Sequence, residues 1–241
     1  RGNDEIKKFY QTGTILQNNL NISAGGADGY VNLNLGNVRR DFILEGDELN
    51  RNTVVLTAGK KINKFTVGGT FTFTNQRTKQ ANVNAATSRS DYTLLTTLLQ
   101  AASNVPIEEF KNRGLYGWNG YYQNPYWARE NNRLEETKNF INLGMNAGYE
   151  INKNIEIVYN GSVQMRNTNQ VSYSNQAISP ADADGGFDSP SQFYQSTLGS
   201  TFYYGDLMAN FNYDLSDALK LKFNVGQNVQ YNYSKRISQG G

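Results

Sequence analysis

The side chains that most often carry out catalysis or bind metals are scarce in this chain of 241 residues. It has no histidine and no cysteine, which excludes Ser-His-Asp and Cys-His catalysis, cysteine–histidine zinc sites and disulfide scaffolds. The adjacent carboxylates Glu108 and Glu109 could exchange protons with a substrate, but no other catalytic group accompanies them. We therefore expect neither an enzyme nor a bound cofactor.

An acidic segment, Asp182–Asp188, is a second candidate for chemistry because it carries three carboxylates in seven residues. The spacing resembles the beginning of a calcium-binding loop. An EF-hand requires glutamate at the twelfth position, however, and Phe193 stands there. We expect a solvated turn and no metal site.

Aromatic residues gather between positions 118 and 129, beside amide and guanidinium groups. Aromatic faces with such donors nearby suit sugar rings, and they suit a protein partner equally well. The alternative is that the same side chains pack within their own loop. The residues expected to contact substrate or partner are Trp118, Tyr121, Tyr122, Tyr126, Trp127 and Arg129.

The elements that must position these residues are strands. Apolar and polar residues alternate with a period of two, the pattern of a strand with one apolar and one polar face. In the clearest run, from Phe65 to Thr74, phenylalanine, valine and glycine alternate with threonine and glycine. Eight such runs cover residues 19–24, 31–35, 52–59, 65–74, 141–150, 155–166, 207–214 and 219–233.

The polar faces of these runs are rich in Asn, Thr, Gln, Ser and Gly rather than in Lys–Glu pairs. Many of the runs are about 10 residues long, as a tilted strand needs to cross a bilayer. Tyrosines lie near several strand ends, for example Tyr149, Tyr213 and Tyr233, as in the aromatic girdles of membrane barrels. Mean hydropathy is −0.64, which suits a barrel because only every second residue must face lipid. The pattern predicts an all-β, antiparallel transmembrane β-barrel segment.

Short and long connections alternate along the chain. The segments 25–29, 60–64, 151–154 and 214–218 are expected to be tight turns, whereas 39–51, 75–138 and 167–201 are expected to be long loops. Outer-membrane barrels have short periplasmic turns and long extracellular loops. We therefore expect residues 1–241 to form about eight strands of a larger barrel of about 22 strands, with 75–138 as a long extracellular loop.

A short amphipathic helix is expected inside this loop, from Asp91 to Gln100, with Leu94, Leu98 and Leu99 on one side. Pro106 is expected to begin a second turn. The helix could dock a lid or gate a substrate. The alternative is that it buries its leucines against the barrel rim.

Several segments resemble the start of the barrel in SusC/RagA-like TonB-dependent transporters of Bacteroidetes. They are Phe9–Gly13, then Asn19–Gly26, then Tyr30–Leu35, and later Gly117–Gly120 followed by Asn124–Trp127. The resemblance implies an internal barrel fragment without the plug and the remaining strands. It also implies energised import of large nutrients, oligosaccharides or oligopeptides, across the bacterial outer membrane.

The same resemblance implies two partners: a SusD-like surface lipoprotein that acts as a lid, and TonB acting through the plug region. A third expected partner is outer-membrane lipid or lipopolysaccharide, because the basic residues Arg39, Arg40, Lys60 and Lys61 stand near strand ends, where such residues meet headgroup phosphates. A net charge of +2 is too small to indicate a nucleic acid. Two alternatives stay open. One is another outer-membrane barrel, such as a passive porin or an assembly or secretion component, and the other is a soluble, secreted β-rich adhesin.

Overall fold

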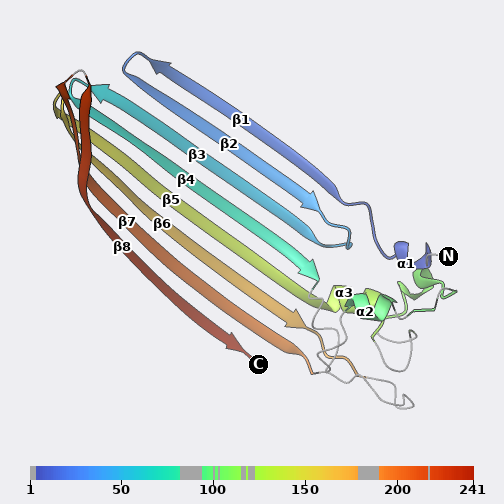
Figure 1. The fold of residues 1–241 in the computed structure, drawn as a ribbon. Helices are drawn as coiled ribbons and strands as arrows, with labels where there is room; N and C mark the ends of the chain where they lie inside the picture. The colour runs from blue at the N-terminus through green and yellow to red at the C-terminus, as the bar shows by residue number, and fades with distance from the viewer. Residues whose placement is uncertain are drawn as a thin grey trace.

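Eight antiparallel strands form one sheet in the order of the chain, β1 to β8 (Figure 1). The computed structural model describes residues 4–81, 94–99, 101–102, 104–114, 118, 123–178, 190–216 and 218–241. The strands are β1 Thr14–Gly26, β2 Gly29–Asp41, β3 Glu48–Ile62, β4 Phe65–Ala81, β5 Asn132–Asn152, β6 Ile155–Ser174, β7 Gln192–Ser216 and β8 Leu219–Gly240. The predicted all-β antiparallel fold is confirmed. The sheet is open, with β1 and β8 at its two edges.

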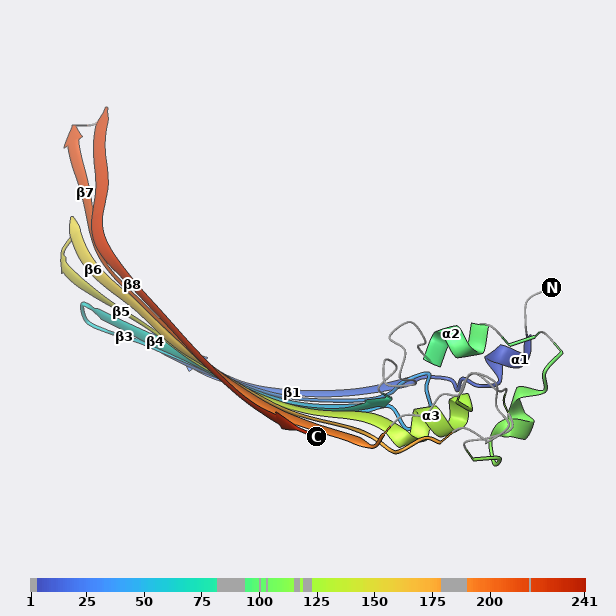
Figure 2. The same cartoon turned by 90° about the horizontal axis from the view of Figure 1, so that it is seen from below.

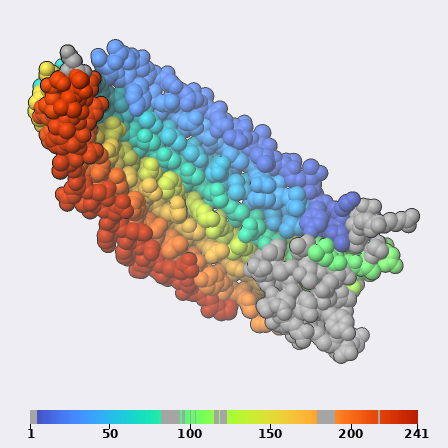
Figure 3. Space-filling view, in the orientation of Figure 1, coloured from blue at the N-terminus to red at the C-terminus, as the bar shows by residue number. Residues whose placement is uncertain are grey.

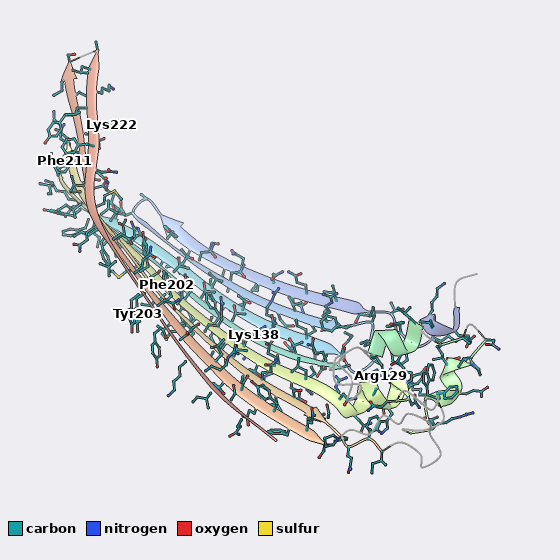
Figure 4. The ribbon with its side chains drawn as sticks, turned by 60° about the horizontal axis from the view of Figure 1, so that its bottom comes forward. Arg129, Lys138, Phe202, Tyr203, Phe211 and Lys222 are labelled. Carbon is teal, nitrogen blue, oxygen red and sulfur yellow. The ribbon has the colours of Figure 1, made fainter. Side chains whose placement is uncertain are left out.

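The register sorts the side chains of the eight strands into two faces. One row of directly paired residues is apolar throughout: Ile22, Leu33, Leu56, Phe71, Leu143, Val163, Tyr203 and Tyr231. The row one residue along points to the other face and is mostly amide or hydroxyl: Asn21, Asn34, Val55, Thr72, Asn142, Gln164, Phe202 and Asn232. We call these the apolar face and the polar face. Figure 4 labels Phe202 and Tyr203, neighbours in β7 on opposite faces.

The apolar face has the height of a membrane belt. On β4 it runs from Phe65 to Phe73, a span of about 27 Å along the strand. A tilt of about 40° reduces this to about 21 Å, close to the apolar band of about 25 Å in outer-membrane barrels. Figure 3 shows the strands as one continuous layer of side chains from β1 to β8.

All four tight turns lie at one end of the sheet, as expected, and the other connections lie at the opposite end with the helices (Figure 1). Asn63 in the β3–β4 turn has a φ of 53°, a left-handed conformation that asparagine tolerates. We call the two ends the hairpin end and the loop end.

The strands continue further toward the loop end than the sequence indicates. The β2–β3 connection is residues 42–47 rather than 39–51, and β4 and β5 extend into both sides of the expected loop 75–138. Beyond the apolar belt both faces of the sheet carry polar residues, so the alternation of apolar and polar residues disappears from the sequence. The backbones of neighbouring strands nevertheless stay paired there. The expected strand ends therefore fall short of the observed ones.

The helices all lie at the loop end. They are α1 Asp4–Lys7, α2 Leu94–Leu99, the 3₁₀ helix η1 Ile107–Phe110 and α3 Pro125–Asn131. Figure 2 shows α1 and α2 on one side of the sheet. A small cavity of about 220 Å³ lies there between Leu94 of α2 and Gln80, a polar-face position of β4. No helix among the described residues is long and apolar enough to cross a membrane.

Candidate functional site

The polar face forms one wall of the candidate site. Its amide and hydroxyl side chains can exchange hydrogen bonds with a hydrophilic molecule at little cost, because each both donates and accepts or rotates to suit. Lumen-facing residues of this kind line aqueous barrels, whereas the apolar face is suited to lipid.

Basic residues collect on the polar face near the loop end. Arg51, Lys138 and Arg236 occupy one register row that crosses β3 to β8, and Arg166 lies one row nearer the hairpin end. Lys138 pairs with Glu136 at 2.6 Å, and the Arg166 guanidinium lies 5.6 Å from the centre of the Phe140 ring. This part of the wall attracts anions, carboxylates among them.

A compact apolar core joins the segment before β1 to the β4–β5 loop. Its members come from the segment that follows α1 and from α2, η1 and α3: Phe9, Leu94, Leu98, Ile107, Tyr126 and Ala128. The rings of Phe9 and Tyr126 meet edge to face at 4.9 Å between centroids. We call these six residues the loop core. It holds the described parts of the loop against the rim of the sheet.

The sequence Asn124-Pro125 begins α3. The Asn124 side chain accepts a hydrogen bond from the Tyr126 N–H at 3.1 Å, as a helix N-cap does, and Pro125 occupies the first helical position. The Asn124 amide nitrogen also donates to the carbonyls of Phe110 at 2.7 Å and Gly114 at 2.8 Å. One fully buried side chain therefore ties α3 to η1.

Arg129 lies inside the loop core, with 2% of its surface exposed (Figure 4). Its guanidinium is 5.3 Å from the ring centres of both Phe9 and Tyr126. One nitrogen, Nη2, donates to Glu45 at 3.1 Å and to Glu130 at 3.3 Å. Its charge is thus held by two aromatic faces and two carboxylates.

The carboxylates around the loop core have pKa values shifted in opposite directions. A hydrogen bond from Lys111 and the charge of Arg129 lower the pKa of Glu45. Burial raises the pKa of Asp47, outweighing its bonds from the Ala81 N–H at 2.7 Å and from Arg133 at 3.0 Å. Burial also raises the pKa of Tyr126.

The structure brings part of the predicted contact set together. Tyr126 and Arg129 are buried in the loop core, whereas Trp127 and Trp118 are half-buried, the latter edge to face with Phe110 at 5.1 Å. Tyr121 and Tyr122 lie outside the described residues.

The helix expected at Asp91–Gln100 is found as α2. Leu94 and Leu98 are buried in the loop core, Leu99 is exposed, and Asp91 lies outside the described residues. The turn expected at Pro106 is η1. Leu94 and Leu98 thus pack against other members of the loop core, whereas the second interpretation placed them against the barrel rim.

Sequence reasoning did not assign Phe9, Glu45 and Asp47 to the site. Phe9 and Glu45 contact Arg129, and Asp47 contacts Arg133, although each pair is far apart in the sequence. One signal was available for Phe9, since it stands in the Phe9–Gly13 segment that carries the family resemblance. No metal-binding group of three or more acidic side chains occurs in the described ranges, and Asp182–Asp188 falls outside them.

Comparison with known proteins identifies the architecture. No protein-family model and no curated protein matches the sequence. A solved structure of the RagAB peptide importer in an open-open state matches 98% of this chain with a TM-score of 0.73 and 14% identity. A closed-closed state of the same importer and a structure of the RagAB peptide transporter match with TM-scores of 0.72, at 12% and 14% identity.

In each comparison, this chain covers 26% of the matched chain, about a quarter of its length. The matched structures are transporters, not enzymes. The expected likeness to SusC/RagA-like transporters is thereby confirmed at the level of the fold: this chain has the architecture of an eight-stranded section of a RagAB importer chain.

Proposed function

We propose that this chain forms part of the wall of an outer-membrane transporter that imports large hydrophilic nutrients, oligosaccharides or oligopeptides. The observation that carries the proposal is the register of eight strands, which puts an apolar belt on one face and amide and hydroxyl groups on the other. The likeness to peptide importers over 98% of the chain supports the same reading. The hairpin end faces the periplasm and the loop end faces outward.

The loop end is proposed to meet the cargo and a SusD-like lipoprotein lid. Trp118 and Trp127 are half-buried, and Tyr121 and Tyr122 stay predicted contacts. Tyr126 and Arg129 are proposed to support this contact surface without touching the cargo, because their burial fixes the position of α3. Energy is proposed to come from TonB through a plug.

An uptake assay tests the proposal. The intact protein is expressed in an outer membrane lacking its own copy, and import of labelled oligopeptides and oligosaccharides of graded length is measured with and without TonB. Saturable uptake that stops on TonB depletion supports the proposal. Uptake that rises linearly with concentration and ignores TonB would instead identify a passive porin.

A charge series on the polar face sharpens the test. Arg51→Gln and Arg236→Gln should weaken uptake of peptides rich in Asp and Glu more than uptake of neutral peptides or sugars, because both arginines lie in the basic row. Equal effects on all cargo would remove these residues from the cargo path.

A further inference from the structure

Asparagines form an unbroken row across six neighbouring strands. Each member is paired directly with the next, and the residues are Asn18, Asn37, Asn52, Asn75, Asn139 and Asn167. Side-chain hydrogen bonds join Asn37 to Asn52 and Asn75 to Asn139, each at 2.7 Å. We call this set the asparagine row.

The asparagine row lies on the apolar face, directly beyond the belt. The preceding row on the same face is Leu20, Leu35, Val54, Phe73, Ile141, Met165, Thr201 and Tyr233. The change from hydrocarbon to amide side chains thus occurs within one step of the ladder on six strands. Such a boundary on a lipid-facing surface marks the end of the hydrocarbon layer.

One step further toward the loop end, the same face carries two arginines on either side of an asparagine. Arg39 pairs with Asn50, and Asn50 pairs with Arg77, so the three side chains follow one another on β2, β3 and β4. Both arginines are exposed. Within the part of the chain that the structure describes, neither guanidinium is paired with a carboxylate.

A polar groove of about 620 Å³ includes these side chains. Its charged lining residues are Arg39, Arg40, Arg77, Lys79, Asp41 and Glu48. Both carboxylates already have partners: Glu48 pairs with Lys79 at 3.3 Å, and Asp41 accepts a hydrogen bond from the Thr14 hydroxyl at 2.8 Å. Four basic and two acidic residues give the groove a net positive charge, and the guanidinium groups of Arg39 and Arg77, which lie on the same face, can each bind a phosphate through two N–H groups.

The depth of these rows selects the kind of anion. The asparagine row lies about 5 Å beyond the belt, and the Arg39–Asn50–Arg77 row about 10 Å beyond it, at about 3.4 Å per residue and a tilt of about 40°. Phospholipid headgroups occupy about 5–8 Å on each side of the hydrocarbon. A larger headgroup, with sugars at the height of the amides and phosphate above them, spans both rows.

We propose that Arg39, Asn50 and Arg77, with the asparagine row beneath them, form a binding surface for a phosphorylated glycolipid of the outer leaflet. This inference rests on the proposed outer-membrane orientation. Amides exchange hydrogen bonds with sugar hydroxyls, and the two arginines hold the phosphate. Arg39, Asn50 and Arg77 lie on three neighbouring strands, β2 to β4, and the surface uses no residue of the basic row on the polar face.

The test is lipid retention by the intact protein in nanodiscs of phosphatidylcholine doped with lipid A that carries its phosphates, followed by native mass spectrometry. The double variant Arg39→Gln/Arg77→Gln should retain about fivefold less lipid A, the scale expected for two exposed ion pairs. Arg51→Gln is the control for loss of positive charge, because it removes one guanidinium from the residue that follows Asn50, on the opposite face of β3. It should retain lipid A like the wild type.

Other outcomes overturn the proposal. Equal retention by the double variant and Arg51→Gln removes the two arginines from the site. Equal retention of phosphatidylglycerol and lipid A means that the surface takes any anionic lipid, and retention of lipid A lacking its phosphates means that phosphate is not recognised. The readout is independent of transport, so a failure of import leaves it interpretable, and its own failure leaves the uptake assay intact.

Discussion

The guanidinium of Arg133 donates from Nη1 to the Asp47 carboxylate at 3.0 Å, joining the β2–β3 connection to the start of β5 across 86 residues of sequence. The two side chains are 11% and 8% exposed. Arg133 also donates to the Gly46 carbonyl at 2.6 Å and to the Arg129 carbonyl at 3.2 Å. The pair fixes the loop to the sheet at one point.

Replacing Asp47 with alanine should destabilise the loop core by about 3 kcal/mol, because it leaves the largely buried Arg133 without its carboxylate partner and the buried Ala81 N–H without its acceptor. Hydrogen exchange of the Leu98 amide measures the change. Glu48→Ala is the control, since it breaks an exposed pair with Lys79 and should cost about 0.5 kcal/mol or less. Equal protection in both variants would contradict the anchoring role.

Arg129→Ala should loosen the loop core by about 2–3 kcal/mol, since it removes a desolvated cation from the rings of Phe9 and Tyr126 and leaves a void beside them. Limited proteolysis of the β4–β5 loop should then accelerate. Arg113→Ala offers a matched comparison, because that guanidinium lies 4.8 Å from the Phe110 ring but half of its side chain is exposed. Similar cleavage rates for both variants would argue against a stabilising role for the contacts of Arg129 with the two rings.

Asn124→Ala should cost about 2–3 kcal/mol, from a lost N-cap and from the carbonyls of Phe110 and Gly114 that lose a buried donor. Exchange of the amides in α3 reports it. Asn112→Ala, at an exposed position beside η1, should leave exchange unchanged. A silent Asn124 variant would mean that the cap is dispensable.

The face assignment is tested by arginine at two neighbouring positions of β4. Phe71→Arg puts a charge in the belt and should destabilise the folded protein in a bilayer by about 2–4 kcal/mol, whereas Thr72→Arg on the polar face should change stability by about 1 kcal/mol or less. Equilibrium unfolding from liposomes gives both values. The reverse order would exchange the two faces.

Acid should weaken the loop core through Glu45. Its pKa is lowered in the folded state, so its stabilising contribution is complete above the ordinary value of 4.5 and is lost as pH falls through the lower folded value. Hydrogen exchange of α2 between pH 6 and 3 should show this loss. Asp47, with a raised pKa, contributes with the opposite sign, so the proper comparison is Glu45→Gln, which keeps Asp47. If the pH-dependent increase in hydrogen exchange of α2 persists in Glu45→Gln, it comes from another titratable group.

The sequence was informative where one face differed from the other. The alternation around Leu56 and Phe71 predicts both strands and their shared face, because only one side of the belt is apolar. At Asn52 and Asn75 the same strands have polar residues on both sides, so the period vanishes although pairing continues. Their expected ends therefore fell short.

The candidate site was harder to predict because its contacts are distant in sequence. The aromatic cluster in the sequence predicts a role for Tyr126 and Arg129, but it does not predict that Phe9 packs against both. Burial turned a residue expected at a contact surface into one that supports the surface. Composition identifies which side chains are present in a loop, whereas their exposure depends on segments distant in sequence, such as the one with Phe9, that pack against them.

Every strand pairs with its neighbours in the chain, and this arrangement has a kinetic consequence. Six of the seven pairings can form between nearby segments, but β4 and β5 must meet across about fifty intervening residues. Closing that span costs about 2 kcal/mol more chain entropy than closing a four-residue turn. Asp47 bonds to Ala81 at the end of β4 and to Arg133 at the start of β5, the two ends of this loop. These bonds hold its ends together once formed, so the sheet should grow as two four-stranded halves whose joining is the slow step.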